Sequence, residues 1–247
     1  MRGLITYGLM AVLSLGSVGV GAEPRKDLAD AIVGGDSIPA RYQIDSIEEA
    51  RALLQADSYP SDPKVRRMQI SDAVREFSEV DGYAILVDKQ LDQTPLDDKT
   101  VFLLQVYKNG LLFRSYVADV GSPGDKEIRG DRKTPEGLFS SFSFSSGRYG
   151  DAILINYPNR EDAKRGIEDN LITPAEAARI DHAISNGGIS PQDTDLGGYI
   201  EIHNGGTGSV FHTTGCVALR DNDQTELLGI LGPIYDSGVD VKVGVIQ

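Results

Sequence analysis

Cysteine is almost absent from this sequence: among its 247 residues only Cys216 carries a thiol. A single cysteine excludes an intramolecular disulfide. Cysteines that enter an oxidising compartment normally occur in pairs, because a free thiol is liable to oxidation and stray coupling. In an exported protein, a solitary cysteine is therefore either a tolerated buried residue or a nucleophile.

Basic charge and long apolar runs are also scarce. The sequence has 24 Lys and Arg against 37 Asp and Glu, a net charge of −13, and we expect no nucleic-acid partner because that function needs a concentrated basic face. One long apolar run, Leu4 to Val20, follows the positive Arg2. This run is too short, and too interrupted by glycine, for a helix that spans a membrane. The small residues that follow, up to Ala22, form a site of the kind that signal peptidase cleaves. Residues 1–22 are therefore predicted to be a signal peptide, cleaved near Ala22.

The rest of the chain divides into a helical segment, residues 23–82, and a body with strand signals, residues 83–247. Ser46 and Glu49 form a capping box that predicts a short helix ending near residue 55. A second helix is predicted over 64–78, after a break that contains two prolines. These helices either pack against the body or guide substrate, and packing is the default expectation.

The body is predicted to be mainly β with accessory helices, an α+β fold. Its β-prone runs are interrupted by two helices, which begin at Thr173-Pro174 and after Asp223. The predicted strands cover 83–87, 101–107, 111–120, 138–144, 152–155, 199–203, a short piece near Phe211, and 239–246.

The strand that ends at His203 carries the first candidate catalytic group. Strand alternation sends Ile200 and Ile202 to one face and places His203 on the other, polar face with Glu201. The chain returns thirteen positions later to Cys216, so the two side chains are expected to meet at the mouth of one loop. An imidazole there can lower the pKa of the thiol by stabilising the thiolate, and can later protonate a leaving amine.

The sequence Thr213-Thr214-Gly215-Cys216 predicts a tight turn at the thiol. The backbone N–H groups of Thr214, Gly215 and Cys216 are candidate donors for an oxyanion hole, which a tetrahedral intermediate requires. Other interpretations remain open at this point. His212 is a rival to His203 as the base. His203, His212 and Cys216 together are also a possible zinc ligand set, and free cysteine is often simply buried.

The residues quoted above, with Gly130-Asp131 through Thr134-Pro135-Glu136-Gly137, resemble the catalytic signature of L,D-transpeptidase (YkuD-type) domains. The resemblance covers roughly residues 83–247 and is strongest to the murein transpeptidase and hydrolase branch, in which Gly-Cys-Val-Ala-Leu occurs. It implies a β-sandwich of mixed sheets. Many members have histidine where this chain has Thr214 and arginine where it has Ala218; Arg220 is a candidate for that arginine's role.

The resemblance also implies a reaction. Cys216 would attack a peptidoglycan stem peptide to form a thioester, with His203 as acid and base, and Asn204, Thr213, Arg220 and His212 would support catalysis or bind substrate. An amine of a second stem, or of an envelope lipoprotein, would resolve the thioester, whereas water would make the protein a carboxypeptidase or amidase. No metal or organic cofactor is implied, and the site of action would be the periplasm or cell envelope. A catalytically idle wall-binding module is the remaining alternative.

Overall fold

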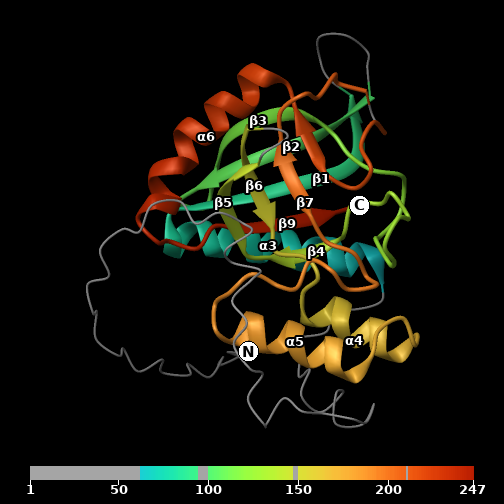
Figure 1. Cartoon of the computed structure of the whole chain (residues 1–247). Helices are drawn as coiled ribbons and strands as arrows, with labels where there is room; N and C mark the ends of the chain where they lie inside the picture. Colours follow the sequence, from blue (N-terminus) through green and yellow to red (C-terminus); the bar gives the residue numbers. More distant parts are fainter. Residues whose placement is uncertain (1–61, 94–99, 147–149, 210) are drawn as a thin grey trace, which may run out of the picture.

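The computed structural model describes residues 62–93, 100–146, 150–209 and 211–247. Within them, the strands join one mixed sheet in the order β4-β9-β1-β2-β3-β8-β7-β6-β5 (Figure 1). The strands are β1 Tyr83–Gln93, β2 Thr100–Lys108, β3 Leu111–Asp119, β4 Gly137–Phe139, β5 Ser141–Ser146, β6 Gly150–Ile155, β7 Ile200–His203, β8 Val217–Leu219 and β9 Lys242–Ile246. The helices are α3 Pro63–Asp81, α4 Arg160–Glu168, α5 Pro174–Ser185 and α6 Asp221–Asp236.

The sheet encloses the main hydrophobic core. Ile85 of β1, Ile153 of β6 and Ile202 of β7 belong to one buried cluster, although β1 lies far from the neighbouring strands β6 and β7 in the sheet order. Leu227 and Leu231 of α6 complete this cluster from one side, and Figure 1 shows α6 along one flank of the sheet. The predicted strand-rich α+β class, with mixed strand directions, is therefore confirmed.

Helix α3 packs on the opposite face of the sheet. Ile70 and Val74 of α3 bury themselves against Ala84 and Leu86 of β1, as helical spacing on one side and strand alternation on the other allow. Asp62 caps the helix by accepting from the N–H groups of the first turn. The helix predicted over 64–78 is thus present and packs against the body. The helix predicted near residues 46–55 and the signal peptide at 1–22 lie outside the described residues.

Several elements differ from the sequence prediction for identifiable reasons. The strand predicted over 138–144 is divided at Ser140, because β4 pairs with β9 while β5 pairs with β6. Phe211 forms only an isolated bridge to Val120. Helix α6 begins at Asp221, before the predicted start after Asp223. Helix α4 and strand β8 were not predicted. No helix in the part of the chain described here combines the length and apolarity that crossing a membrane requires.

Candidate active site

The pairing of β7 with β8 brings the predicted nucleophile and base together. The two strands are parallel, with Ile202 opposite Val217 and His203 opposite Ala218. Continuing this register by one residue places Glu201 beside Cys216, on the same face as His203. A cavity of about 350 Å³ opens there. Its lining contains six of the predicted site residues, His203, Asn204, His212, Thr213, Thr214 and Cys216, together with Gly205 and Ala218.

His203 is held in one orientation by the residue that follows it. Its ring is buried, and Nδ1 lies 2.5 Å from the carbonyl oxygen of Asn204. A carbonyl oxygen only accepts hydrogen bonds, so Nδ1 carries a proton, and in the neutral ring Nε2 is the acceptor nitrogen. His203 is therefore arranged as a base at Nε2, and Asn204 contributes through its main chain.

The thiol of Cys216 is protonated in the resting structure. Sγ donates to the carbonyl oxygen of Tyr199 over 3.4 Å. Burial raises the pKa of the thiol to about 11; the backbone N–H of Glu201 lowers it, the carboxylate of Glu201 raises it, and Lys126 lowers it. The expected lowering of the thiol pKa is therefore wrong for this structure. Attack by sulfur requires a base that removes the proton.

The turn that presents Cys216 is braced by a hydroxyl group. Thr213 Oγ1 donates to the carbonyl oxygen of Cys216 (2.6 Å) and accepts from the N–H of Gly215 (3.2 Å). Gly215 has φ 130°, and a Cβ there would lie 2.9 Å from the carbonyl oxygen of Lys133, so only glycine fits. Because the Gly215 N–H is used inside the turn, the N–H groups of Thr214 and Cys216 are the remaining candidates for the predicted oxyanion hole.

The loop after His203 is fixed by contacts that the sequence did not reveal. The N–H groups of three successive residues, Gly205 to Thr207, donate to the Asp221 carboxylate (3.0 Å), the Leu219 carbonyl (2.7 Å) and the Asp119 carboxylate (2.7 Å). Asp119 is fully buried at the end of β3. Asp221, the first residue of α6, accepts from this loop, and the cap position of α6 is Arg220, whose side chain makes no capping bond.

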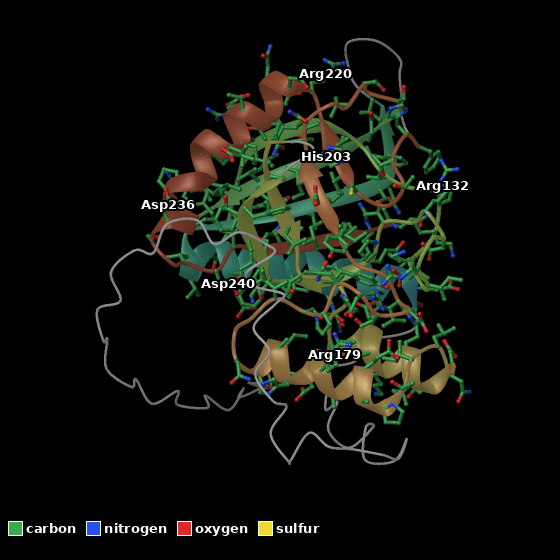
Figure 2. All side chains as sticks on the ribbon, in the orientation of Figure 1. Arg132, Arg179, His203, Arg220, Asp236 and Asp240 are labelled. Atoms are coloured by element: carbon green, nitrogen blue, oxygen red, sulfur yellow. The ribbon has the colours of Figure 1, made fainter. Side chains whose placement is uncertain are left out.

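The other predicted site residues separate into two groups. Asn204, Thr213 and His212 line the cavity; His212 is exposed, and its backbone N–H donates to Val120 (3.1 Å). Arg220 is absent from the lining of the cavity, and its guanidinium lies beside Gly208. Figure 2 shows Arg220 near the start of α6, away from His203. Arg220 is therefore not among the residues that surround His203 and Cys216 in this cavity.

The zinc alternative gains no support from this arrangement. His203, His212 and Cys216 line the same cavity. Nevertheless, within residues 62–93, 100–146, 150–209 and 211–247 no group of three or more His, Cys, Asp or Glu side chains is arranged to hold a metal ion.

Tyr199 and Gln192 fix the backbone beneath the thiol, and neither was recognised from sequence. Tyr199 has φ 56°, which is strained for a residue with a Cβ, and its side chain is exposed. Its N–H donates to Oε1 of the buried Gln192 over 2.6 Å, and Gln192 Nε2 donates to the carbonyl of Tyr157. This anchor sets the position of the Tyr199 carbonyl that receives the Cys216 S–H.

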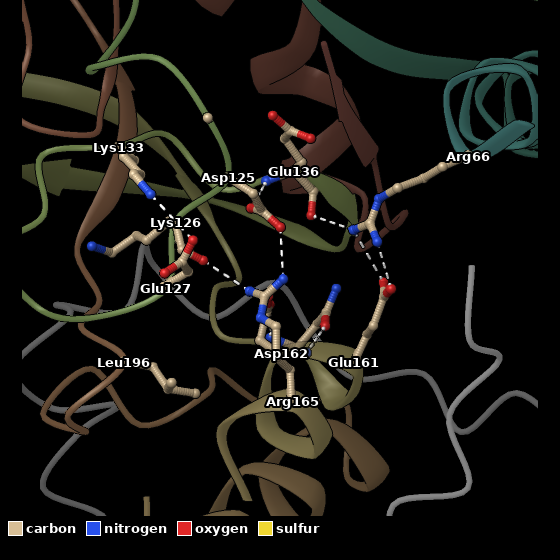
Figure 3. A network of polar contacts seen from close by, with 12 residues as sticks. Arg66, Asp125, Lys126, Glu127, Lys133, Glu136, Glu161, Asp162, Arg165 and Leu196 are labelled. Atoms are coloured by element: carbon tan, nitrogen blue, oxygen red, sulfur yellow. Dashed lines mark hydrogen bonds and ion pairs between the residues drawn. The ribbon is translucent and has the colours of Figure 1, made fainter. Parts of the chain in front are cut away.

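A polar network joins α3 and α4 to the loop between β3 and β4 (Figure 3). Arg165 of α4 binds the Asp125 carboxylate (2.6 Å), the Asp162 carboxylate (2.9 Å) and the Lys126 carbonyl (2.8 Å). Arg66 of α3 binds the Glu161 carboxylate (2.7 Å). These contacts fasten the loop between β3 and β4, whose Lys133 carbonyl faces Gly215. The helices thus position the thiol turn indirectly.

Comparison with known proteins gives one family. Residues 82–241 match the model of the L,D-transpeptidase catalytic domain (YkuD). No curated protein matches the chain.

Solved structures with similarity include the helical cell shape determining protein Pgp2 from Campylobacter jejuni, with TM-score 0.39 and 19% identity over 81% of this chain and 55% of that one. An L,D-transpeptidase from Mycobacterium smegmatis has TM-score 0.34 and 13% identity over 67% and 60% of the two chains. One from Xylanimonas cellulosilytica DSM 15894 has TM-score 0.31 and 16% identity over 66% and 60%. The chain thus spans less than two thirds of each of these structures.

Proposed function

Because the chain belongs to the L,D-transpeptidase catalytic domain family, we propose that it is a cysteine-dependent acyltransferase that acts on the stem peptides of peptidoglycan. The observation that supports this most is the common cavity of His203 and Cys216, in which the Nδ1 proton of His203 is already committed to Asn204. In this tautomer Nε2 is the acceptor nitrogen, and it takes the proton of the thiol when sulfur attacks. With the predicted signal peptide, this function assigns the protein to the periplasm or cell envelope.

Acylation follows from these roles. Nε2 of His203 takes the S–H proton as Sγ of Cys216 attacks the carbonyl carbon of the third stem residue. The N–H groups of Thr214 and Cys216 bind the oxygen that becomes negative. When the C–N bond breaks, His203 returns the proton to the departing amine of D-alanine, and a thioester with Cys216 remains. No metal or organic cofactor enters this scheme.

The thioester is resolved by an amine. His203 takes a proton from the attacking side-chain amine of a second stem, the new amide forms, and the sulfur leaves and regains the proton. An amine of an envelope lipoprotein is an alternative acceptor with the same chemistry. Water in place of the amine makes the protein a carboxypeptidase or amidase, with a free carboxylate as product.

Mass analysis of products tests this proposal. The protein without residues 1–22 is incubated with purified muropeptides that carry tetrapeptide stems. A cross-linked dimer that has lost one D-alanine is the expected product, and the Cys216→Ala variant should form none. Trimmed monomer alone would assign the hydrolase outcome. Unchanged substrate with folded wild-type protein would contradict an activity on stem peptides and favour an idle wall-binding domain.

A further inference from the structure

Glu201 is a buried acid that no step of the proposed reaction uses. It lies in β7, its exposed fraction is 8%, and its Oε2 atom has no hydrogen-bond partner. Leaving a carboxyl oxygen without a partner in the interior costs free energy, and a leucine of similar size would avoid that cost. The position of this carboxyl group therefore calls for an explanation.

The carboxyl group of Glu201 lies beside the reacting pair. The parallel register places Glu201 next to Cys216, and strand alternation places it on the face of His203. The pKa of the Cys216 thiol responds to Glu201 in two opposite ways: its backbone N–H favours the thiolate, while its carboxylate disfavours it. The charge of Glu201 thus acts on the Cys216 thiol, although Glu201 is not one of the residues that line the cavity.

No charged group around Glu201 in the described part of the chain is placed to cancel the effect of its carboxylate on the Cys216 thiol. On β6 the residue paired with Glu201 is the apolar Leu154. Lys126, from the loop between β3 and β4, also acts on the thiol, but its Nζ is bound to the Asp131 carboxylate and the Ile128 carbonyl, each at 2.8 Å. On its own strand, Glu201 shares a face with His203, whose Nδ1 is bound to Asn204.

We propose that Glu201 is a positioning residue that controls the proton of Cys216: its carboxylate keeps the thiol protonated, and proton uptake by the carboxylate allows the thiol to ionise. The proposal rests on the proposed function only in taking Cys216 as the reacting group. Burial raises the pKa of Glu201 to about 7, so the control operates near neutral pH. The resting thiol would thereby be protected from oxidation until the site is neutralised.

Alkylation of Cys216 by iodoacetamide, followed by intact mass from about pH 5.5 to about pH 9.5, tests this without any peptidoglycan substrate. A neighbouring like charge raises the pKa of a thiol by about one unit. The logarithm of the wild-type alkylation rate should therefore rise with pH, but near pH 7 it should level off, so that above this pH the rate is about tenfold lower than a straight line from the acid end would give. In Glu201→Gln the flattening should vanish. The ratio of variant to wild-type rate should be about one at the acid end and about tenfold at the alkaline end.

Two controls isolate the effect. Asp181→Asn removes a carboxylate that is also buried but lies on α5 and is bound to Arg160, so this variant should keep the wild-type profile. His203→Gln removes the imidazole and should keep the flattening, because that feature belongs to Glu201.

A wild-type profile that is one straight line, or a rate ratio that is constant with pH, would overturn the proposal. If Glu201→Gln fails to fold, the wild-type and His203→Gln profiles decide together: a flattening that is lost in His203→Gln would also overturn the proposal. Failure to process muropeptides would leave this result unaffected, so the two hypotheses can fail separately.

Discussion

Gly206→Ala tests whether the loop after His203 must lie against β8. A Cβ at Gly206 would lie 2.7 Å from the carbonyl oxygen of Ala218 and 2.8 Å from its carbonyl carbon. Both atoms are backbone, so no side-chain rotation can relieve the contact. The loop must therefore move away from the strand.

The cost of this movement can be worked out from the contacts that it breaks. The Gly206 N–H bond to the Leu219 carbonyl, 2.7 Å long, contributes about 1 kcal/mol, and overpacking typically costs about 1–3 kcal/mol. We expect the free energy of unfolding to fall by about 2–4 kcal/mol, the sum of the two contributions. Because Asn204, which holds the His203 ring, begins the same loop, a displacement of about 1 Å should lower acylation by about 10²-fold.

Denaturant unfolding and the rate of acylation of Cys216 measure the two effects. Gly229→Ala is the matched control: Gly229 lies in α6, and its added Cβ would have no atom within 4 Å. Removing a glycine from a helix interior should stabilise by about 0.5–1 kcal/mol without changing the rate. If Gly206→Ala proved as stable and as active as Gly229→Ala, the reasoning about the fixed loop would be refuted.

Three further outcomes are expected. His203→Gln should lower acylation by ~10²–10⁴-fold and His212→Gln far less, with circular dichroism showing both variants folded; the reverse ranking would make His212 the base. A carbapenem should add once to Cys216 by intact mass and not to Cys216→Ala, and an unmodified wild-type mass would count against the nucleophile. The free energy of unfolding should fall by about 2 kcal/mol between about pH 4.5 and pH 7, because burial raises the folded-state pKa of Glu201 to about 7. In Glu201→Gln the free energy of unfolding should depend less on pH over this range. An unchanged pH dependence in this variant would show that another buried acid causes it.

Strand alternation and turn residues in the sequence predicted the strand that carries His203 and the turn that carries Cys216. Alternation in β7 assigned His203 and Glu201 to one face, and the Gly-Cys turn indicated a thiol presented at a loop. What the pattern could not show was that the polar face of β7 is covered. Glu201 and His203 are both buried there, which reverses the expected direction of the thiol pKa.

The missed features depend on contacts between distant parts of the chain. Asp119 binds Thr207, 88 residues away, and Gln192 reaches both Tyr157 and Tyr199. Helix α4 was missed because its sequence, Arg160–Glu168, is mostly polar and has few apolar positions to reveal a helical period. Its capping box at Asn159 and Asp162 was the one available signal.

Capture of the acyl-enzyme is the most direct test of Cys216 as the nucleophile. The protein without residues 1–22 is mixed with a tetrapeptide-stem muropeptide, quenched in acid within seconds, and analysed by intact mass and peptide mapping. We predict an adduct on Cys216 equal to the muropeptide minus D-alanine, accumulating in His203→Gln more slowly than in wild type and absent from Cys216→Ala. Product formation by Cys216→Ala at the wild-type rate would contradict the account.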